Sequence, residues 1–272
     1  MERFMKRYIV FLKQVPLSTK VEMDPVTKTL KRSSALSQVN PDDLYALQAA
    51  LDLRRSTGAE VIAVSMGPLS AEVVLREAIQ RGADRAILLS SPAFAGSDTW
   101  CTSLVLASAV RKIGEYDILF FGRIAIDGDT AQVGPEVAGH LNIPQVTQLV
   151  NVESCTDKYI RLFRCIGNAK QHMEVDFPCA IMVSRENGEL NHPTLSGWRR
   201  AQKQEILHWD EADLGLNTSS VGLQASPTKV LSTTVPQSNK KVCWITDVIT
   251  LSQIICNNIN NANQQLKTSS DS

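Results

Sequence analysis

Short apolar runs that alternate with helical patterns constrain the fold of this chain most strongly. Four such runs lie at 8–12, 60–66, 86–89 and 118–121. Each is too short for a typical helix and largely apolar, as is typical of strands buried on both faces of a parallel sheet. Because helical patterns separate the runs, the sequence predicts a mainly parallel α/β sheet with helices on both faces and right-handed crossovers.

Capping residues and glycines mark the helices between these runs. Asn40 precedes a proline and two acids, which is typical of a helix start. We expect further helices from Ser70 to Gly82, from Ser97 or Asp98 to about Gly114, and from Asp129–Thr130 to about His140.

The pattern changes after Pro144. Strand patterns at 147–153, 159–165, 172–176 and 179–184 follow one another without helices, so we expect antiparallel hairpins that extend or flank the sheet. The expected divisions are a nucleotide-binding α/β domain at 1–185, an extended arm with a partner-docking loop at 186–245, and a terminal helix with its tail at 246–272.

The arm and the terminal helix are expected to lie on another molecule. Residues 186–245 contain Pro, Gly and Ser clusters without a clear core element, and they are too many for an ordinary loop. The helix expected at 247–266 carries apolar residues at spacings of three and four.

Charge and cysteine usage exclude several classes of protein. The chain has 28 Lys and Arg against 28 Asp and Glu, and this balance argues against nucleic acid as the main partner. No stretch approaches the ~18 apolar residues of a membrane span, and the run at 8–12 is too short for a signal-peptide core. The six cysteines form neither a CxxC pair nor a metal-ligand cluster. We therefore expect a cytoplasmic protein without a metal site.

The glycine spacings exclude the common nucleotide-binding motifs but leave one candidate loop. GxGxxG, the P-loop and GxSxG are all absent. The segment 122–135 follows an expected strand and opens an expected helix, where free backbone N–H groups favour an anion. Thr130 and Gln132 offer hydrogen bonds to that anion, whereas Asp127 and Asp129 are expected to cap N–H groups or to face a ribose hydroxyl. The alternative is a well-capped helix with a glycine turn and no ligand.

Further ligand contacts are expected at the carboxyl ends of the neighbouring strands, at 11–13, 65–67 and 94–99. Asn40 has two possible roles, one facing an adenine or ribose edge and the other simply capping its helix.

Five segments in the same order resemble the small (beta) subunit of an electron-transfer flavoprotein: Lys13–Pro16, Val39–Asp43, Gly58–Pro68, Arg81–Ala86 and Ala125–Pro135. The resemblance implies a larger alpha subunit that carries a redox FAD. It also implies an adenine nucleotide in this subunit, which is AMP in simple electron carriers and a second FAD in the electron-bifurcating kind. Ala93–Thr99, Leu214–Leu216, Val221–Leu223 and Ser226–Val230 are similar to the bifurcating kind.

The strand-end positions and the resemblance together define the expected site. The candidate cofactor-binding residues are Phe11, Leu12, Lys13, Asn40, Asp42, Met66, Phe94, Gly96, Ser97, Asp98, Thr99, Ile126, Asp127, Gly128, Asp129, Thr130, Ala131, Gln132, Val133 and Gly134. In Pro193–Lys203, which resembles the family's recognition loop, Leu195 is the expected anchor for an acyl-CoA-type or related dehydrogenase.

The expected function is a beta subunit that binds FAD and passes electrons from NADH to the alpha-subunit FAD and a dehydrogenase, with electron bifurcation. No catalytic side chain of its own is expected. Three alternatives remain open: a simple carrier with structural AMP, a nucleotide-binding regulatory protein, and a structural subunit that has lost its nucleotide.

Overall fold

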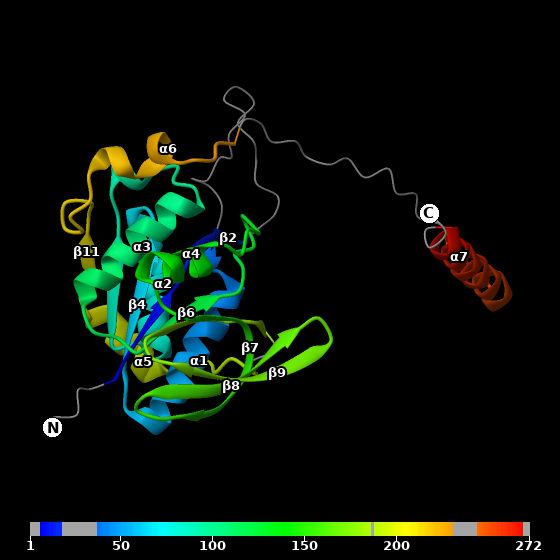
Figure 1. Cartoon of the computed structure of the whole chain (residues 1–272), viewed down its shortest axis with the longest axis horizontal. Coiled ribbons are helices and arrows are strands. Elements are labelled where there is room, and N and C mark those ends of the chain that lie inside the picture. The colour runs from blue at the N-terminus through cyan, green and yellow to red at the C-terminus, as the bar shows by residue number, and fades with distance from the viewer. Residues whose placement is uncertain (1–5, 18–36, 186–187, 231–243, 269–272) are drawn as a thin grey trace. The chain divides into compact units, whose positions relative to one another are not determined.

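The computed structural model describes residues 6–17, 37–185, 188–230 and 244–268. The chain forms two compact units, Met1–Leu231 and Ser232–Ser272, and each is described by itself. Figure 1 shows the first unit as a sheet covered by helices.

Nine strands form one sheet in the first unit. They are β1 (Arg7–Phe11), β4 (Glu60–Met66), β5 (Arg85–Leu89), β6 (Ile118–Gly122), β7 (Gln145–Cys155), β8 (Tyr159–Ile166), β9 (Ala169–Asp176), β10 (Cys179–Val183) and β11 (Leu207–Trp209). Their order is β11-β5-β4-β1-β6-β10-β7-β8-β9. Pairing is parallel from β11 through β7 and antiparallel from β7 to β9. A separate antiparallel pair joins β2 (Gln14–Pro16) to β3 (Ser37–Val39).

Helices cover both faces of the sheet. They are α1 (Pro41–Thr57), α2 (Glu72–Arg81), α3 (Thr99–Ile113), α4 (Val133–Leu141), α5 (Leu195–Lys203) and the short α6 (Gly222–Ala225). Tyr8 and Val10 face the layer of α1 and α2, whereas Ile9 and Phe11 face the layer of α3 and α4. Because both faces of β1 are buried, its sequence is continuously apolar. The predicted α/β class, with helices on both faces and late hairpins, is confirmed.

The fourth predicted helix begins later than expected. α4 starts at Val133 rather than at Asp129–Thr130. Asp129 and Ala131 have φ angles of 53° and 54°. Residues in this left-handed region cannot continue a right-handed helix, so residues 129–132 belong to the preceding loop.

Part of the predicted arm belongs to the core, contrary to expectation. Ala201, Ile206 and Val221 are buried, and α5 is tied to α2 because Arg76 Nη1 donates to the carbonyl of Ala201 at 2.7 Å. β11 also pairs with β5 at the sheet edge. Residues 186–187 and 231–243 lie outside the described residues. The three-domain division and the contact of the arm with another molecule stay predictions.

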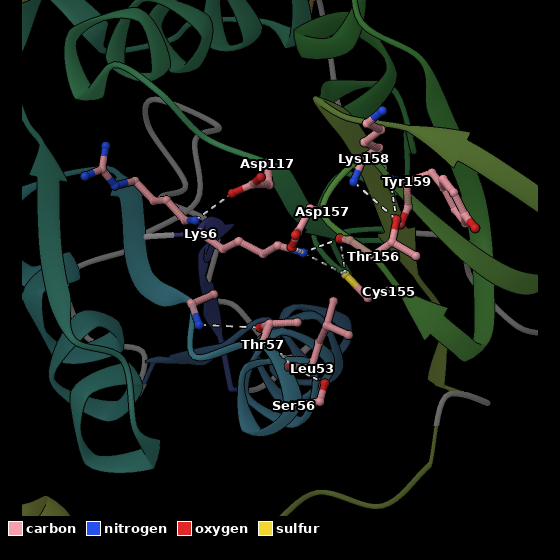
Figure 2. A network of polar contacts seen from close by, with 12 residues as sticks. Lys6, Leu53, Ser56, Thr57, Asp117, Cys155, Thr156, Asp157, Lys158 and Tyr159 are labelled. Carbon is pink, nitrogen blue, oxygen red and sulfur yellow. Dashed lines mark hydrogen bonds and ion pairs between the residues drawn. The ribbon is translucent and has the colours of Figure 1, made fainter. Parts of the chain in front are cut away.

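A polar network closes the amino end of the sheet (Figure 2). Lys6 reaches the turn after β7, where Nζ donates to the carbonyl of Thr156 and lies 3.4 Å from Asp157 Oδ1. The Tyr8 hydroxyl donates to Thr57 Oγ1 at 3.0 Å, and burial raises the pKa of Tyr8. These contacts tie the start of β1 to the turn after β7 and to the end of α1.

The second unit contains α7 (Val248–Thr268), which confirms the last predicted helix. Several apolar residues of α7 are exposed, including Val248, Leu251, Ile255 and Ile259. Within the described residues, no helix is long and apolar enough to span a membrane.

Candidate functional site

The sheet has a topological switch point between β1 and β6. From β1 the chain proceeds to β4 and β5 on one side, while β6 and β10 lie on the other. Loops that leave such a point diverge, and ligands of parallel α/β sheets bind there at the carboxyl ends of the strands. Lys13 after β1 and Asp127 after β6 meet across it, with Lys13 Nζ 2.7 Å from Asp127 Oδ1. Asp127 therefore pairs with a lysine rather than capping backbone N–H groups.

The loop after β6 lies at the surface. Residues 126–132 are all exposed. Ala131 lies in the left-handed region, which costs roughly 1–2 kcal/mol for a residue with a side chain. Gln132 follows it in the right-handed region, and adjacent residues of opposite handedness form the backbone nests that bind anions. Strained residues of this kind cluster at ligand-binding sites.

The N-terminus of α4 completes an anion-binding surface with this loop. Its N-cap residue Gln132 forms no side-chain capping bond, so the first N–H groups and the positive end of the helix dipole are not satisfied by a cap. A Cβ on Gly134 would lie 3.1 Å from the Met182 side chain and 3.2 Å from that of Phe121. Glycine at this position therefore lets α4 approach the sheet closely.

Asn40 supports the loop from below. Its side chain is fully buried. Nδ2 donates to the carbonyl of Ile124 at 2.8 Å, and Oδ1 accepts from the N–H of Ile126 at 3.1 Å. Asn40 occupies the N-cap position of α1 but forms no side-chain capping bond. The expected capping bond is therefore absent, and the side chain holds the loop instead. The expected contact with an adenine or ribose edge stays a prediction.

Asp42 lies fully buried beneath two arginines. Arg185 Nε is 2.5 Å from Asp42 Oδ1, and Arg123 Nε is 3.7 Å from Oδ2. Both arginine side chains are about half exposed, and they carry positive charge at the ends of β6 and β10. Sequence reasoning missed both arginines, although Arg185 directly follows an expected strand and Arg123 comes two residues after another.

The loop 94–99 is held by the arm. The Phe94 ring is buried in the core layer with Val221. The Ser97 hydroxyl donates to the carbonyl of Phe94 at 2.8 Å and accepts from the N–H of Gly222 at 3.2 Å. These side chains are therefore already engaged, and the loop offers its backbone to a ligand more readily than the Phe94 ring or the Ser97 hydroxyl.

Asp98 connects this loop to both α3 and the arm. Oδ1 accepts from the N–H of Cys101 at 3.0 Å, which confirms Asp98 as the N-cap. Oδ2 accepts from Thr228 N at 2.9 Å and from Thr228 Oγ1 at 2.8 Å. Burial acts to raise the pKa of Asp98, but the hydrogen bonds from Cys101 and Thr228 outweigh it and hold that pKa below its ordinary value.

Thr99 links the two candidate loops, since its hydroxyl lies 3.3 Å from Gln132 Oε1 and 3.1 Å from Glu136 Oε1. The remaining predicted positions lie at or after the strand ends. Phe11 and Leu12 are buried, and Met66 is half-buried. Gly96 is exposed, and a Cβ on it would lie 2.9 Å from the Leu223 side chain. The predicted docking residue Leu195 lies apart from them on α5, where 68% of it is exposed.

No group of three or more His, Cys, Asp or Glu side chains is placed to hold a metal ion in the part of the chain that the structure describes. The cysteines that the structure describes form no disulfide; they are Cys101, Cys155, Cys165, Cys179 and Cys256.

The electron transfer flavoprotein domain matches residues 27–214. The chain belongs to this family. It is 44% identical, over 85% of its length and 89% of the relative's, to an electron transfer flavoprotein subunit beta of Thermoanaerobacterium thermosaccharolyticum. It is 40% identical, over 85% and 88% of the two chains, to the caffeyl-CoA reductase-Etf complex subunit CarD of Acetobacterium woodii. Protein FixA of Azorhizobium caulinodans is 39% identical over 88% of each chain. The resemblance found in the sequence is thus confirmed, and electron transfer is the function of the family.

Proposed function

We propose that this chain is the beta subunit of a heterodimeric electron-transfer flavoprotein and binds FAD at the switch point between β1 and β6. The observation that carries the proposal is the exposed loop 126–132 leading into the uncapped N-terminus of α4. Backbone N–H groups and a helix dipole of this kind favour a phosphate group. Lys13 pairs with Asp127 at the neighbouring strand ends, and Arg123 and Arg185 share Asp42, so these ion pairs leave positive charge in excess.

The residues present fit an adenosine phosphate. The nest at Ala131–Gln132 and the first turn of α4 would receive the phosphate groups. Thr99, between the two loops, and the backbone of 94–98 would face a flavin ring. A bound flavin supplies the capacity to accept two electrons as a hydride and to pass them on, while the protein supplies orientation and electrostatics.

We further propose that NADH donates to this FAD and that electrons continue to the alpha-subunit FAD and to a dehydrogenase, with electron bifurcation. Support comes from the relatives named CarD and FixA and from the segments 93–99 and 226–230, which are similar to the bifurcating kind. Leu195, exposed beside basic residues on α5, has the chemistry of an apolar anchor for the dehydrogenase. A cytoplasmic location stays a prediction.

A simple carrier with structural AMP is the second candidate, and one observation favours it. The arm already occupies the side chains of Ser97 and Asp98, as expected if this loop contacts no flavin ring. The regulatory module has no such observation in its favour.

The purified heterodimer distinguishes the two candidates. One sample is denatured, and the released nucleotides are separated and quantified. A second, intact sample is titrated with NADH under anaerobic conditions. Two FAD per heterodimer and bleaching of the flavin absorbance by NADH are expected. One FAD with one AMP would establish the simple carrier, whereas two FAD without bleaching would remove NADH as donor.

A further inference from the structure

Asp43 joins Asn40 in a buried pair beneath both loops of the switch point. Asp43 is 7% exposed. Its Oδ2 accepts from the backbone N–H of Lys13 at 2.7 Å, and its Oδ1 accepts from Asn40 Nδ2 at 2.9 Å. Asn40 in turn binds Ile124 and Ile126. One pair of side chains at the start of α1 therefore fixes the backbone of the loop after β1 and of the loop after β6.

The carboxylate also lies directly against the end of β6. A Cβ on Gly122 would come within 2.2 Å of Asp43 Oδ1 and 2.7 Å of its backbone nitrogen. Only glycine at this position allows the start of α1 to approach so closely. The start of α1, with its buried pair, thus packs directly against the backbone of Gly122.

Asp43 is an ionisable group in a buried position. Burial raises the pKa of Asp43 to about 7, opposed by the hydrogen bonds from Asn40 and Lys13 N. Asp42 on the same helix raises it further, and the Lys13 ammonium lowers it; Arg123 and Arg185, from the ends of β6 and β10, face Asp42. A buried ionisable group whose hydrogen bonds hold the backbone of a loop and a second buried side chain is expected at a functional site more than in an ordinary core.

We propose that Asn40 and Asp43 are positioning residues that hold the loops after β1 and β6 in the shape that receives an adenosine phosphate, without touching it. This inference rests on the proposed nucleotide site. It makes the two loops mechanically dependent on each other, because the same amide–carboxylate pair supports both. Loss of either side chain therefore alters the binding surface from below.

The test uses the heterodimer stripped of nucleotide, with amide hydrogen exchange and AMP binding as separate readouts. In Asp43→Asn one carboxylate oxygen becomes an NH₂ group, so one of its two hydrogen bonds is lost. We expect at least ~10-fold faster exchange in 12–16 and in 124–128, and at least ~10-fold weaker AMP binding. Asp117→Asn is the matched control, because Asp117 Oδ2 accepts from the N–H of Arg7 at 2.8 Å at the opposite end of the same strands.

A double variant that exchanges the two residues, Asn40→Asp with Asp43→Asn, tests the pairing. It restores an amide–carboxylate pair and an acceptor for Lys13 N, but a carboxylate at position 40 cannot donate to the carbonyl of Ile124. Exchange in 12–16 should return toward the wild-type rate while 124–128 stays fast. Should Asp43→Asn fail to fold, Asn40→Ala gives the same test of the loop after β6.

Three outcomes contradict these proposals in distinguishable ways. Wild-type exchange in both loops of Asp43→Asn, or an equal effect of Asp117→Asn, removes the support role. Faster exchange with unchanged AMP affinity removes the positioning role and leaves a purely structural one. A wild-type heterodimer that binds no AMP, and no more FAD than the one of its alpha subunit, overturns the proposed function itself.

Discussion

At the scale of single residues, two glycines offer a matched test of where the phosphate lies. A Cβ at Gly128 or at Gly139 meets nothing within 4 Å, so a side chain can begin at either position without a clash. Gly128 lies in the loop that should approach the nucleotide, whereas Gly139 is exposed near the end of α4. Heterodimer carrying Gly128→Val should lose most of its bound nucleotide, and Gly139→Val should retain it. Full retention in Gly128→Val would show that this loop is not the binding surface.

Asp43 makes stability depend on pH in a specific direction. Its pKa of about 7 in the folded protein lies above the ordinary value of 3.8. The folded protein therefore holds a proton that the unfolded chain releases, and the free energy of unfolding falls as pH rises from about 4 to about 7 and is level above. Asp43→Asn removes this contribution, so urea unfolding of the variant should lose less stability over that range than wild type. Equal pH dependence would contradict the raised pKa.

At the scale of elements, the segment 222–228 fixes the loop 94–99. Leu223 N donates to the carbonyl of Ala95 at 3.0 Å, and Thr228 binds Asp98. Thr228→Val removes one hydrogen bond to a carboxylate, worth about 1.5–3 kcal/mol, and should speed amide exchange in 94–98 by ~10-fold or more. Ser219→Ala is the control, because the Ser219 hydroxyl bonds only within its own turn, to Asn217. Equal exchange in the two variants would show that the segment does not restrain the loop.

The elements also show what sequence patterns predict well. β4 was predicted at its exact bounds, Glu60–Met66, because a strand buried on both faces is continuously apolar. β11 was missed because three residues, Leu207–Trp209, carry no periodicity. The predicted start of α4 is too early because Ala131 has a left-handed backbone conformation. Alanine favours helices, so its residue type does not indicate this conformation. The role of Asn40 was hidden because its partner Ile124 is 84 positions away.

At the scale of the whole molecule, the chain should depend on its alpha subunit. α7 exposes Leu251, Ile255 and Ile259 along one helix, and a partner that covers such a stripe and the arm should bury more than the ~1,600 Å² of a standard interface. Leu251→Glu with Ile255→Glu should abolish co-purification, while Gln253→Glu, a charge change at a polar residue of the same helix, should not. A monodisperse, stable monomer of the chain expressed alone would contradict this dependence.

The central claim is that an adenine nucleotide lies at the carboxyl ends of β1 and β6, on the loop 126–132 and the N-terminus of α4. The measurement that tests it most directly is a crystal structure of the purified heterodimer with its native nucleotide. We expect phosphate oxygens within hydrogen-bond distance of backbone N–H groups in Thr130–Gly134, with Lys13 nearby. Asn40 and Asp43 should lie beneath the loops, out of contact with the nucleotide. A nucleotide bound elsewhere in this subunit, or no nucleotide in it at all, would contradict the account.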